Sequence, residues 1–281
     1  MVNHDGDFQS LTIPTPARIF AASGRVPVSD RRHRAAENIF RLRTFPPEAR
    51  GANVPPIHEQ QGNSDVAEII LVRHGQANAQ ATDEASYDRL SDLGRQQAGW
   101  LGAHMRDTNP HFDRVLTGTL SRQADTARGM GYDITAQDPR LNELSYFALA
   151  HALEEQHGIP APRDATEFAT HLPQVIDHWA RDRLEGIPER FDAFTTRITE
   201  ALDEACHTPG RTLIVTSGGV IGMALRHTLG LENGGMAKVM LQIMNSSVHR
   251  LEYVHDMLML GAFNATPHLD RPDRAHARTF V

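Results

Sequence analysis

Apolar runs and stretches of helical periodicity alternate along the chain from residue 67 onward. Three short runs, at 68–73, 113–117 and 212–216, are rich in apolar residues, as strands covered on both faces of a sheet are. Helical periodicity follows each run, over about 90–105, 120–130 and 220–229. Strands that alternate with helices predict an α/β layer structure.

The remaining pattern adds a helical segment and further strands. Residues 145–205 have mainly helical periodicity, with Trp179, Ile198 and Leu202 among the expected core positions. Two more apolar runs, 239–244 and 247–253, predict strands near the end of the chain.

The first 66 residues have a different pattern, with seven prolines and little periodicity, which indicates a mostly irregular segment. Residues 29–43 are the exception, because they predict an amphipathic helix with a basic face. That face is either an arm for an acidic partner or, more simply, a solvated surface docked on its own domain or a sister subunit. We predict an N-terminal extension over 1–66 and an α/β domain over 67–281, with a helical cap insertion at 145–205.

Composition narrows the classes of partner. A net charge of −7 argues against general nucleic-acid binding, and no apolar run reaches the roughly 18–20 residues that cross a bilayer. The single Cys206 forms no internal disulfide, and the first residues lack the apolar core of a secretory signal. We expect a cytoplasmic protein that binds neither nucleic acid nor membrane.

Residues that can bind a ligand or take part in chemistry follow the predicted strands. They are Arg73, His74, Arg122, Ser217 and Gly218. Ligands of open α/β sheets bind outside the carboxyl ends of the strands, so these residues are expected to share one crevice. Glu143 follows an extended stretch and adds a carboxylate.

This set of residue types suits phosphoryl chemistry. The two arginines offer planar forks that match phosphate oxygens. A neutral His74 imidazole is a competent nucleophile if an acceptor fixes its tautomer, and the close backbone of Gly75 supplies one. Glu143 would protonate the leaving oxygen and later activate water. The helix N-terminus at Gly218 and Gly219 would add backbone donors for an oxyanion.

Four segments, in this order, resemble motifs of the histidine phosphatase superfamily, which includes the cofactor-dependent phosphoglycerate mutases. The segments are Leu-Val-Arg-His-Gly-Gln at 71–76, Leu-Ser-Asp-Leu-Gly at 90–94, Leu-Ser-Arg-Gln-Ala-Asp-Thr-Ala at 120–127 and Leu-Asn-Glu at 141–143. Asn264 and His268 resemble a C-terminal signature, so the resemblance covers roughly 68–268. It implies a three-layer α/β/α sandwich with a mostly parallel central sheet.

The resemblance also implies roles for the site residues. His74 would be the phosphorylated nucleophile, and Glu143 would be the acid and base. Arg73 and Arg122 would bind the phosphoryl group, and Asn78 would also touch it.

Ser217 departs from the superfamily's usual pattern, in which a second histidine follows the third strand in a Ser-His-Gly-Gly-like turn. Serine donates one neutral hydrogen bond to a phosphoryl oxygen and carries no charge. Loss of a preorganised donor of this kind costs on the order of 10²–10³ in rate. Members with a Thr-Ser-Gly-Gly turn also occur in the superfamily, so the serine resembles a trait of a sublineage. His249 is a candidate to fill the gap.

Several functions stay open. A phosphatase is favoured over a mutase, because Gln-Ala-Asn-Ala at 76–79 lacks the Glu and Trp-Asn pattern of the mutases. The alternative is a non-catalytic phosphate-binding or regulatory protein on the same fold. A serine hydrolase is disfavoured, because a nucleophile elbow needs glycine where Val215 stands.

Other features add no further site. His151 and His157 lie six residues apart, which is not the spacing of paired metal ligands on one helix face. We expect no cofactor or metal, and activity that survives a chelator. The expected partner is a phosphorylated small molecule or phosphoprotein, and the sequence leaves a homo-oligomer open.

Overall fold

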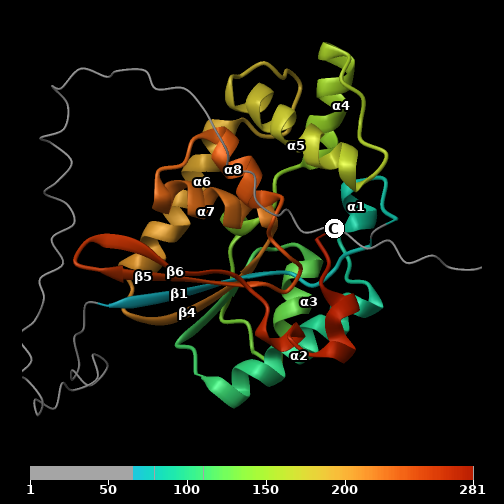
Figure 1. Cartoon of the computed structure of the whole chain (residues 1–281). Coiled ribbons are helices and arrows are strands. Elements are labelled where there is room, and N and C mark those ends of the chain that lie inside the picture. Colours follow the sequence, from blue (N-terminus) through green and yellow to red (C-terminus); the bar gives the residue numbers. More distant parts are fainter. Residues whose placement is uncertain (1–65, 79, 110, 281) are drawn as a thin grey trace, which may run out of the picture. The chain divides into compact units, whose positions relative to one another are not determined.

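The computed structural model describes residues 66–78, 80–109 and 111–280. Its centre is a six-stranded sheet with the order β3-β2-β4-β1-β5-β6 (Figure 1). The strands are β1 (Ala67–Arg73), β2 (Arg114–Thr117), β3 (Ala136–Gln137), β4 (Gly210–Thr216), β5 (Val248–Val254) and β6 (Met257–Ala265). The first four are mutually parallel, and β5 and β6 add an antiparallel edge.

Helices cover both faces of this sheet. They are α1 (Glu84–Tyr87), α2 (Asp92–Thr108), α3 (Ser121–Gly129), α4 (Tyr146–His157), α5 (Ala165–Ala180), α6 (Phe191–Cys206), α7 (Gly218–Leu229) and α8 (Asn233–Met240). Figure 1 shows α2 and α3 on one side of the sheet and α6 and α7 on the other. The three-layer α/β/α sandwich and its mostly parallel sheet are therefore as predicted.

The two layers of core follow from the alternation of side chains along β1. Ile70 and Val72 join the core formed with α2 and α3, whereas Ile69 and Leu71 join the core formed with α6 and α7. Because successive strand residues point to opposite faces, a continuous apolar run is what a strand between two helical layers needs.

The predicted helices are present. Ser91 caps α2 by accepting a hydrogen bond from the Gly94 N–H at 3.0 Å, as its position predicted. Residues 145–205 form α4, α5 and α6, and the three expected core side chains there, Trp179, Ile198 and Leu202, are buried. The helix predicted over 29–43 lies outside the described residues, and the domain limits remain predictions. Within the described ranges, no helix combines the length and apolar character that a membrane crossing requires.

One predicted strand is wrong. Residues 239–244 begin inside α8, which ends at Met240, and do not form a strand. The run is apolar because α8 packs against α7, with Met236 and Ala237 buried. A short apolar run does not by itself distinguish a strand from a buried helix.

The edge strand β6 was not predicted. Among the described residues it pairs with β5 alone, and most of its side chains are partly or fully exposed, including Met257, Met259 and Phe263. Large apolar residues on both faces of β6 hide the alternation that would have marked it as an edge strand.

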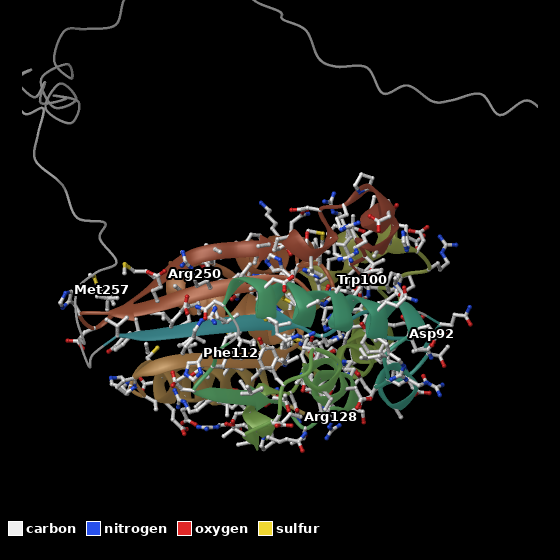
Figure 2. All side chains as sticks on the ribbon, turned by 90° about the horizontal axis from the view of Figure 1, so that it is seen from below. Asp92, Trp100, Phe112, Arg128, Arg250 and Met257 are labelled. Atoms are coloured by element: carbon white, nitrogen blue, oxygen red, sulfur yellow. The ribbon has the colours of Figure 1, made fainter. Side chains whose placement is uncertain are left out.

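The end of the chain returns to the carboxyl edge of the parallel strands. A 3₁₀ helix over Pro272–Ala277 packs on α2, where the Arg274 guanidinium lies 4.7 Å from the centre of the Trp100 ring. Figure 2 labels Trp100 on α2, on the side of the molecule that faces the viewer. Beyond it, the Phe280 carbonyl accepts a hydrogen bond from the Arg73 guanidinium.

Candidate active site

His74 lies directly after β1, and its N–H donates to the Thr216 carbonyl of β4 at 2.8 Å. Its ring is buried, with 1% of the residue exposed. Nδ1 lies 2.7 Å from the Gly75 carbonyl oxygen, which can only accept, so Nδ1 carries the proton. Nε2 therefore keeps its lone pair, and it accepts from Arg122 Nε at 3.2 Å.

The surroundings of His74 keep the ring neutral. Burial is the main reason that its pKa lies well below the usual value of 6.5, and the charges of Arg122 and Arg73 lower it further. The hydrogen bond to Gly75 opposes this shift. A neutral ring with an unprotonated Nε2 is the form that attacks phosphorus.

Gly75 is glycine because α2 lies against it. A Cβ atom at this position would overlap the Gly94 carbonyl. The Gly75 N–H donates to the Thr126 hydroxyl of α3 at 3.0 Å, so helices on both sides fix the loop that holds the His74 tautomer.

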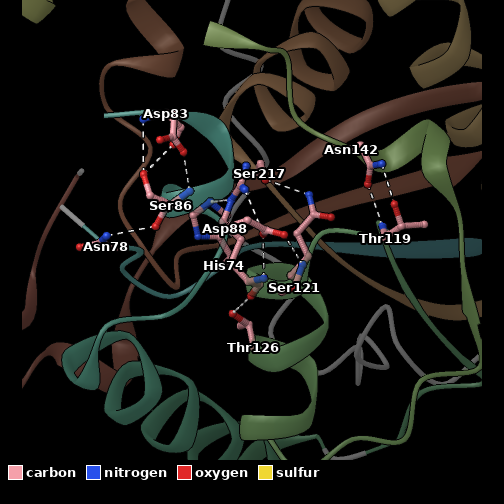
Figure 3. A network of polar contacts seen from close by, with 12 residues as sticks. His74, Asn78, Asp83, Ser86, Asp88, Thr119, Ser121, Thr126, Asn142 and Ser217 are labelled. Carbon is pink, nitrogen blue, oxygen red and sulfur yellow. Dashed lines mark hydrogen bonds and ion pairs between the residues drawn. The ribbon is translucent and has the colours of Figure 1, made fainter. Parts of the chain in front are cut away.

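Arg122 is held by a carboxylate that the sequence did not single out. Asp88 accepts from the Arg122 guanidinium at 3.1 Å and from the backbone N–H groups of Ser121 and Arg122 at 2.9 and 3.1 Å (Figure 3). Leu120, the N-cap residue of α3, makes no side-chain cap of its own. The Asp88 carboxylate therefore has two roles: it caps the N-terminus of α3, and it orients the Arg122 guanidinium toward His74.

The Arg73 guanidinium has a buried N–H available for a ligand. Its Nη1 donates to the Ile243 and Phe280 carbonyls at 2.5 Å each. Its Nε is buried and has no hydrogen-bond partner among the described residues. This Nε lies 3.7 Å from the position of an ideal Cβ on Gly218, at the start of α7. A buried N–H of a charged group without an acceptor is costly, so an anion here would complete its bonding.

Glu143 reaches the same place from the other side. Its carboxylate accepts from the Gly219 N–H at 3.0 Å and from the Leu144 N–H at 2.9 Å. The Gly219 amide was expected to face an oxyanion, and here it holds the carboxylate instead. A Cβ at 219 would overlap the Glu143 carboxylate in its present position, so glycine at 219 lets the carboxylate reach the Gly219 N–H.

Ser217 is fully buried at the N-terminus of α7, where its side chain makes no capping bond. Its hydroxyl oxygen accepts from Gln123 Nε2 at 2.8 Å, and among the described residues no acid or histidine forms a hydrogen bond with it. This arrangement gives no support to a serine nucleophile.

Two expected site residues have other contacts. The Asn78 side chain donates to the Ser86 carbonyl at 3.0 Å and accepts from the Gln80 N–H, so it organises the loop that carries α1. His249 Nδ1 accepts from the Asn264 N–H at 3.2 Å, which leaves Nε2 as the donor to the Ser247 hydroxyl at 3.0 Å. Both nitrogens of His249 are therefore occupied, and it does not replace the missing imidazole beside Ser217.

Helix α1 brings residues that the sequence gave no reason to expect. The Tyr87 ring lies 6.3 Å from the His74 ring and 4.9 Å from Arg122 Cζ. Glu84 accepts from the Phe147 N–H of α4 at 3.1 Å, which ties the cap to the site. Burial raises the pKa of the Glu84 carboxyl, the nearby charge of Glu143 adds to this, and the Phe147 bond and Arg122 oppose it. A four-residue helix has too little periodicity to be recognised in advance.

Metal ligands do not gather at this site. Across the described parts of the chain, no three His, Cys, Asp or Glu side chains come together in a way that could hold a metal ion.

Comparison with known proteins shows the family of this chain. The family model of the histidine phosphatase superfamily (branch 1) matches residues 69–266. A broad-specificity phosphatase of Saccharomyces cerevisiae is 24% identical over 209 residues, which cover 72% of this chain and 86% of the yeast protein. The mitochondrial serine/threonine-protein phosphatase Pgam5 of Drosophila virilis is 28% identical over 180 residues, which cover 59% of this chain and 55% of that protein.

Solved structures show the same fold at lower identity. A phosphoserine phosphatase mutant from Entamoeba histolytica, in complex with phosphoserine, aligns with a TM-score of 0.54 at 19% identity over 72% of this chain and 98% of that one. A phosphoglycerate mutase from Bacillus anthracis aligns with a TM-score of 0.52 at 19% identity over 73% of this chain and 96% of that one. The chain belongs to the histidine phosphatase superfamily, branch 1.

Proposed function

We propose that this protein is a phosphomonoesterase that forms a phosphohistidine on His74. One observation carries the proposal. The unprotonated Nε2 of His74 lies 3.2 Å from Arg122 Nε, and the Nε of Arg73 is buried without a partner among the described residues. A nucleophile between two guanidinium groups, one of them with an unused donor, suits a phosphoryl group.

The first chemical step follows from these positions. His74 Nε2 attacks phosphorus, the bond from phosphorus to the ester oxygen breaks, and Glu143 gives that oxygen a proton. Arg73 and Arg122 neutralise the phosphoryl oxygens throughout. In the second step a water loses its proton to Glu143 and attacks phosphorus, the bond to Nε2 breaks, and phosphate leaves with His74 neutral again.

The relatives agree with hydrolysis. Both curated relatives are named as phosphatases, one of broad specificity and one acting on serine/threonine-phosphorylated protein. For this chain, the substrate class is accordingly a phosphorylated small molecule or a phosphoprotein. We favour hydrolysis over mutase chemistry, since the chain lacks the mutase residues at 76–79.

A non-catalytic phosphate binder is the second candidate. It is favoured by Ser217, which is neutral where an imidazole is usual, and by the Gly219 N–H, which binds Glu143 at 3.0 Å. Such a protein would hold phosphate with Arg73 and Arg122 and release none from an ester.

Hydrolysis of p-nitrophenyl phosphate by the wild type and by His74→Ala separates the two candidates. A phosphatase predicts turnover in the wild type and its loss in His74→Ala, with vanadate inhibiting the wild type. If the wild type binds vanadate and releases no nitrophenol, the proposed function is wrong and the binder is correct.

A further inference from the structure

We propose that Gln123 positions Ser217 as a neutral hydrogen-bond donor to the transferred phosphoryl group. The proposal rests on the proposed function, and it assigns a role to a residue of α3 that neither the sequence motifs nor the comparisons assign. Three observations lead to it: the two bonds of the Gln123 amide, the orientation that they fix, and the place of Ser217 beside His74.

The Gln123 amide nitrogen makes two hydrogen bonds. Nε2 donates to the Leu141 carbonyl at 3.1 Å and to the Ser217 hydroxyl oxygen at 2.8 Å. Gln123 and Ser217 are both fully buried, at 0% exposure each. Since an amide nitrogen has two protons, both are used inside the protein.

The Leu141 carbonyl fixes which way the amide faces. If the Gln123 amide were rotated by half a turn, its oxygen would face the Leu141 oxygen, and two acceptors would be in contact. The Leu141 carbonyl also accepts from the Thr216 hydroxyl at 2.7 Å, so it is anchored independently of Gln123. Nitrogen therefore faces Ser217.

The direction of this hydrogen bond determines whether the Ser217 hydroxyl proton is free to donate. Its oxygen accepts from Gln123, so its own proton is not needed for that contact. Among the described residues no acceptor takes the Ser217 hydroxyl proton. A donor that is itself hydrogen-bonded at oxygen is polarised and donates more strongly.

Ser217 lies between two residues that contact the groups of the proposed phosphoryl site. It follows β4 next to Thr216, whose carbonyl accepts from the His74 N–H at 2.8 Å. The next residue, Gly218, lies beside the unpartnered Arg73 Nε. Figure 3 draws Ser217 in the same polar network as His74, Asp88 and Ser121. The free proton is therefore beside the nucleophile and the guanidinium groups.

The surroundings keep the pair in place. A Cβ on Gly118 would overlap the Gln123 amide oxygen, so the loop after β2 lies directly against it. The Gln123 oxygen has no partner among the described residues, which shows that this side chain is held by the bonds of its nitrogen and by packing.

A double-mutant cycle with Ser217→Ala and Gln123→Met tests the proposal. Ser217→Ala is expected to lower kcat/KM for p-nitrophenyl phosphate by about 10²-fold, the effect of losing one preorganised donor. Gln123→Met keeps the length of the side chain and removes its donor, and it is expected to lower kcat/KM by about tenfold. In the Ser217→Ala background, Gln123→Met is expected to have no further effect, because it acts only through Ser217.

Vanadate inhibition gives a second readout that a structural role would not produce. The affinity for vanadate should fall in the same order across the four proteins as kcat/KM falls. Gln174→Met is the control, because its exposed amide donates to the Thr170 carbonyl within α5, at 3.0 Å, and forms no hydrogen bond with Ser217 or Gln123. It should leave both quantities at the wild-type level.

Two results would overturn the proposal. One is an unchanged kcat/KM in Ser217→Ala, and the other is a tenfold loss from Gln123→Met that persists in the Ser217→Ala background. If the wild type does not hydrolyse the ester, the proposed function fails. The same cycle measured on vanadate binding by calorimetry then still decides the pairing, since coupled losses support it and independent losses contradict it.

Discussion

At the scale of single residues, the His74 ring is prepared by one backbone oxygen and two guanidinium groups. The Gly75 carbonyl places the ring proton on Nδ1, and burial beside Arg122 and Arg73 keeps the ring neutral. The nucleophile therefore needs no base to activate it, and the remaining proton transfer is to the leaving oxygen.

Glu143→Gln tests the proton donor for that oxygen. Glutamine has no acidic proton, so we expect kcat/KM for an alkyl phosphate to fall by about 10²–10⁴-fold. The loss for p-nitrophenyl phosphate should be much smaller, because nitrophenolate leaves without a proton. Steady-state kinetics with both esters measure the difference.

Glu84→Gln is the matched comparison, since Glu84 is the other carboxyl near Arg122. Equal losses with the two esters in Glu143→Gln would show that Glu143 is not the donor. The selective loss in Glu84→Gln alone would transfer that role to Glu84.

The residues that the motifs placed at strand ends do meet. Arg73, His74, Arg122 and Glu143 all lie around the start of α7, as sheet topology required. Contacts between distant segments were not readable from the sequence. Nothing local to Asp88 indicates that it caps α3, and nothing local to Gln123 indicates that it contacts Ser217.

At the scale of the elements, α3 has its N-terminus capped from outside. Asp88 supplies the acceptor that Leu120 lacks, and it accepts from the Arg122 guanidinium as well. Helix stability and arginine orientation therefore depend on one carboxylate.

Asp88→Ala should affect both quantities. We expect a loss of about 1 kcal/mol in unfolding free energy, as for a missing N-cap. We also expect kcat/KM to fall on the order of 10²-fold, because Arg122 is no longer aimed at His74. Urea unfolding and steady-state kinetics measure the two effects.

Asp125→Ala is the control for this variant. Asp125 lies on the same helix, and within the described part of the chain its ion pair is with the exposed Arg128. It should leave kcat/KM unchanged and change stability by less than about 0.5 kcal/mol. A wild-type kcat/KM in Asp88→Ala would contradict the positioning role.

Strands were predicted correctly where turn or glycine residues marked the end of the apolar run. The strands β1 and β4 end in turn residues and are followed by capped or glycine-started helices, which made them readable. The run at 239–244 had no such boundary, and packing of α8 on α7 decided its structure.

At the scale of the whole molecule, burial lowers the pKa of several histidines among the described residues, including His74, His171, His249 and His268. Burial lowers the pKa of His249 to about 3, with the charge of Arg73 contributing, and lowers the pKa of His268 to about 3. His74 is shifted in the same direction. The unfolded chain binds protons at these groups below about pH 6.5, and the folded protein does not.

Stability should therefore fall as the pH decreases from about 6.5 toward 3. His249 and His268 each contribute a slope of about 1.4 kcal/mol per pH unit within this window, so the two together contribute about 3, and His74 and His171 add to it in the same direction. Carboxyl groups add their own slope at the acid end of the window. Urea unfolding at pH 7, 6 and 5 measures the total.

His268→Gln isolates one histidine. The glutamine amide can take the place of Nε2, which lies 2.8 Å from the Ser246 hydroxyl. The variant should lose about 1.4 kcal/mol per pH unit from the slope. A slope equal to that of the wild type would mean that His268 is protonated in the folded protein.

The central claim is that the phosphoryl group is first transferred to His74 Nε2 and then to water. The measurement that tests it most directly is rapid quenching of the enzyme during turnover of p-nitrophenyl phosphate, followed by mass spectrometry of its peptides. The account predicts one acid-labile phosphoryl group on His74 in the wild type and none in His74→Ala. Turnover by His74→Ala at the wild-type rate, or a phosphoryl group on another residue, would contradict it.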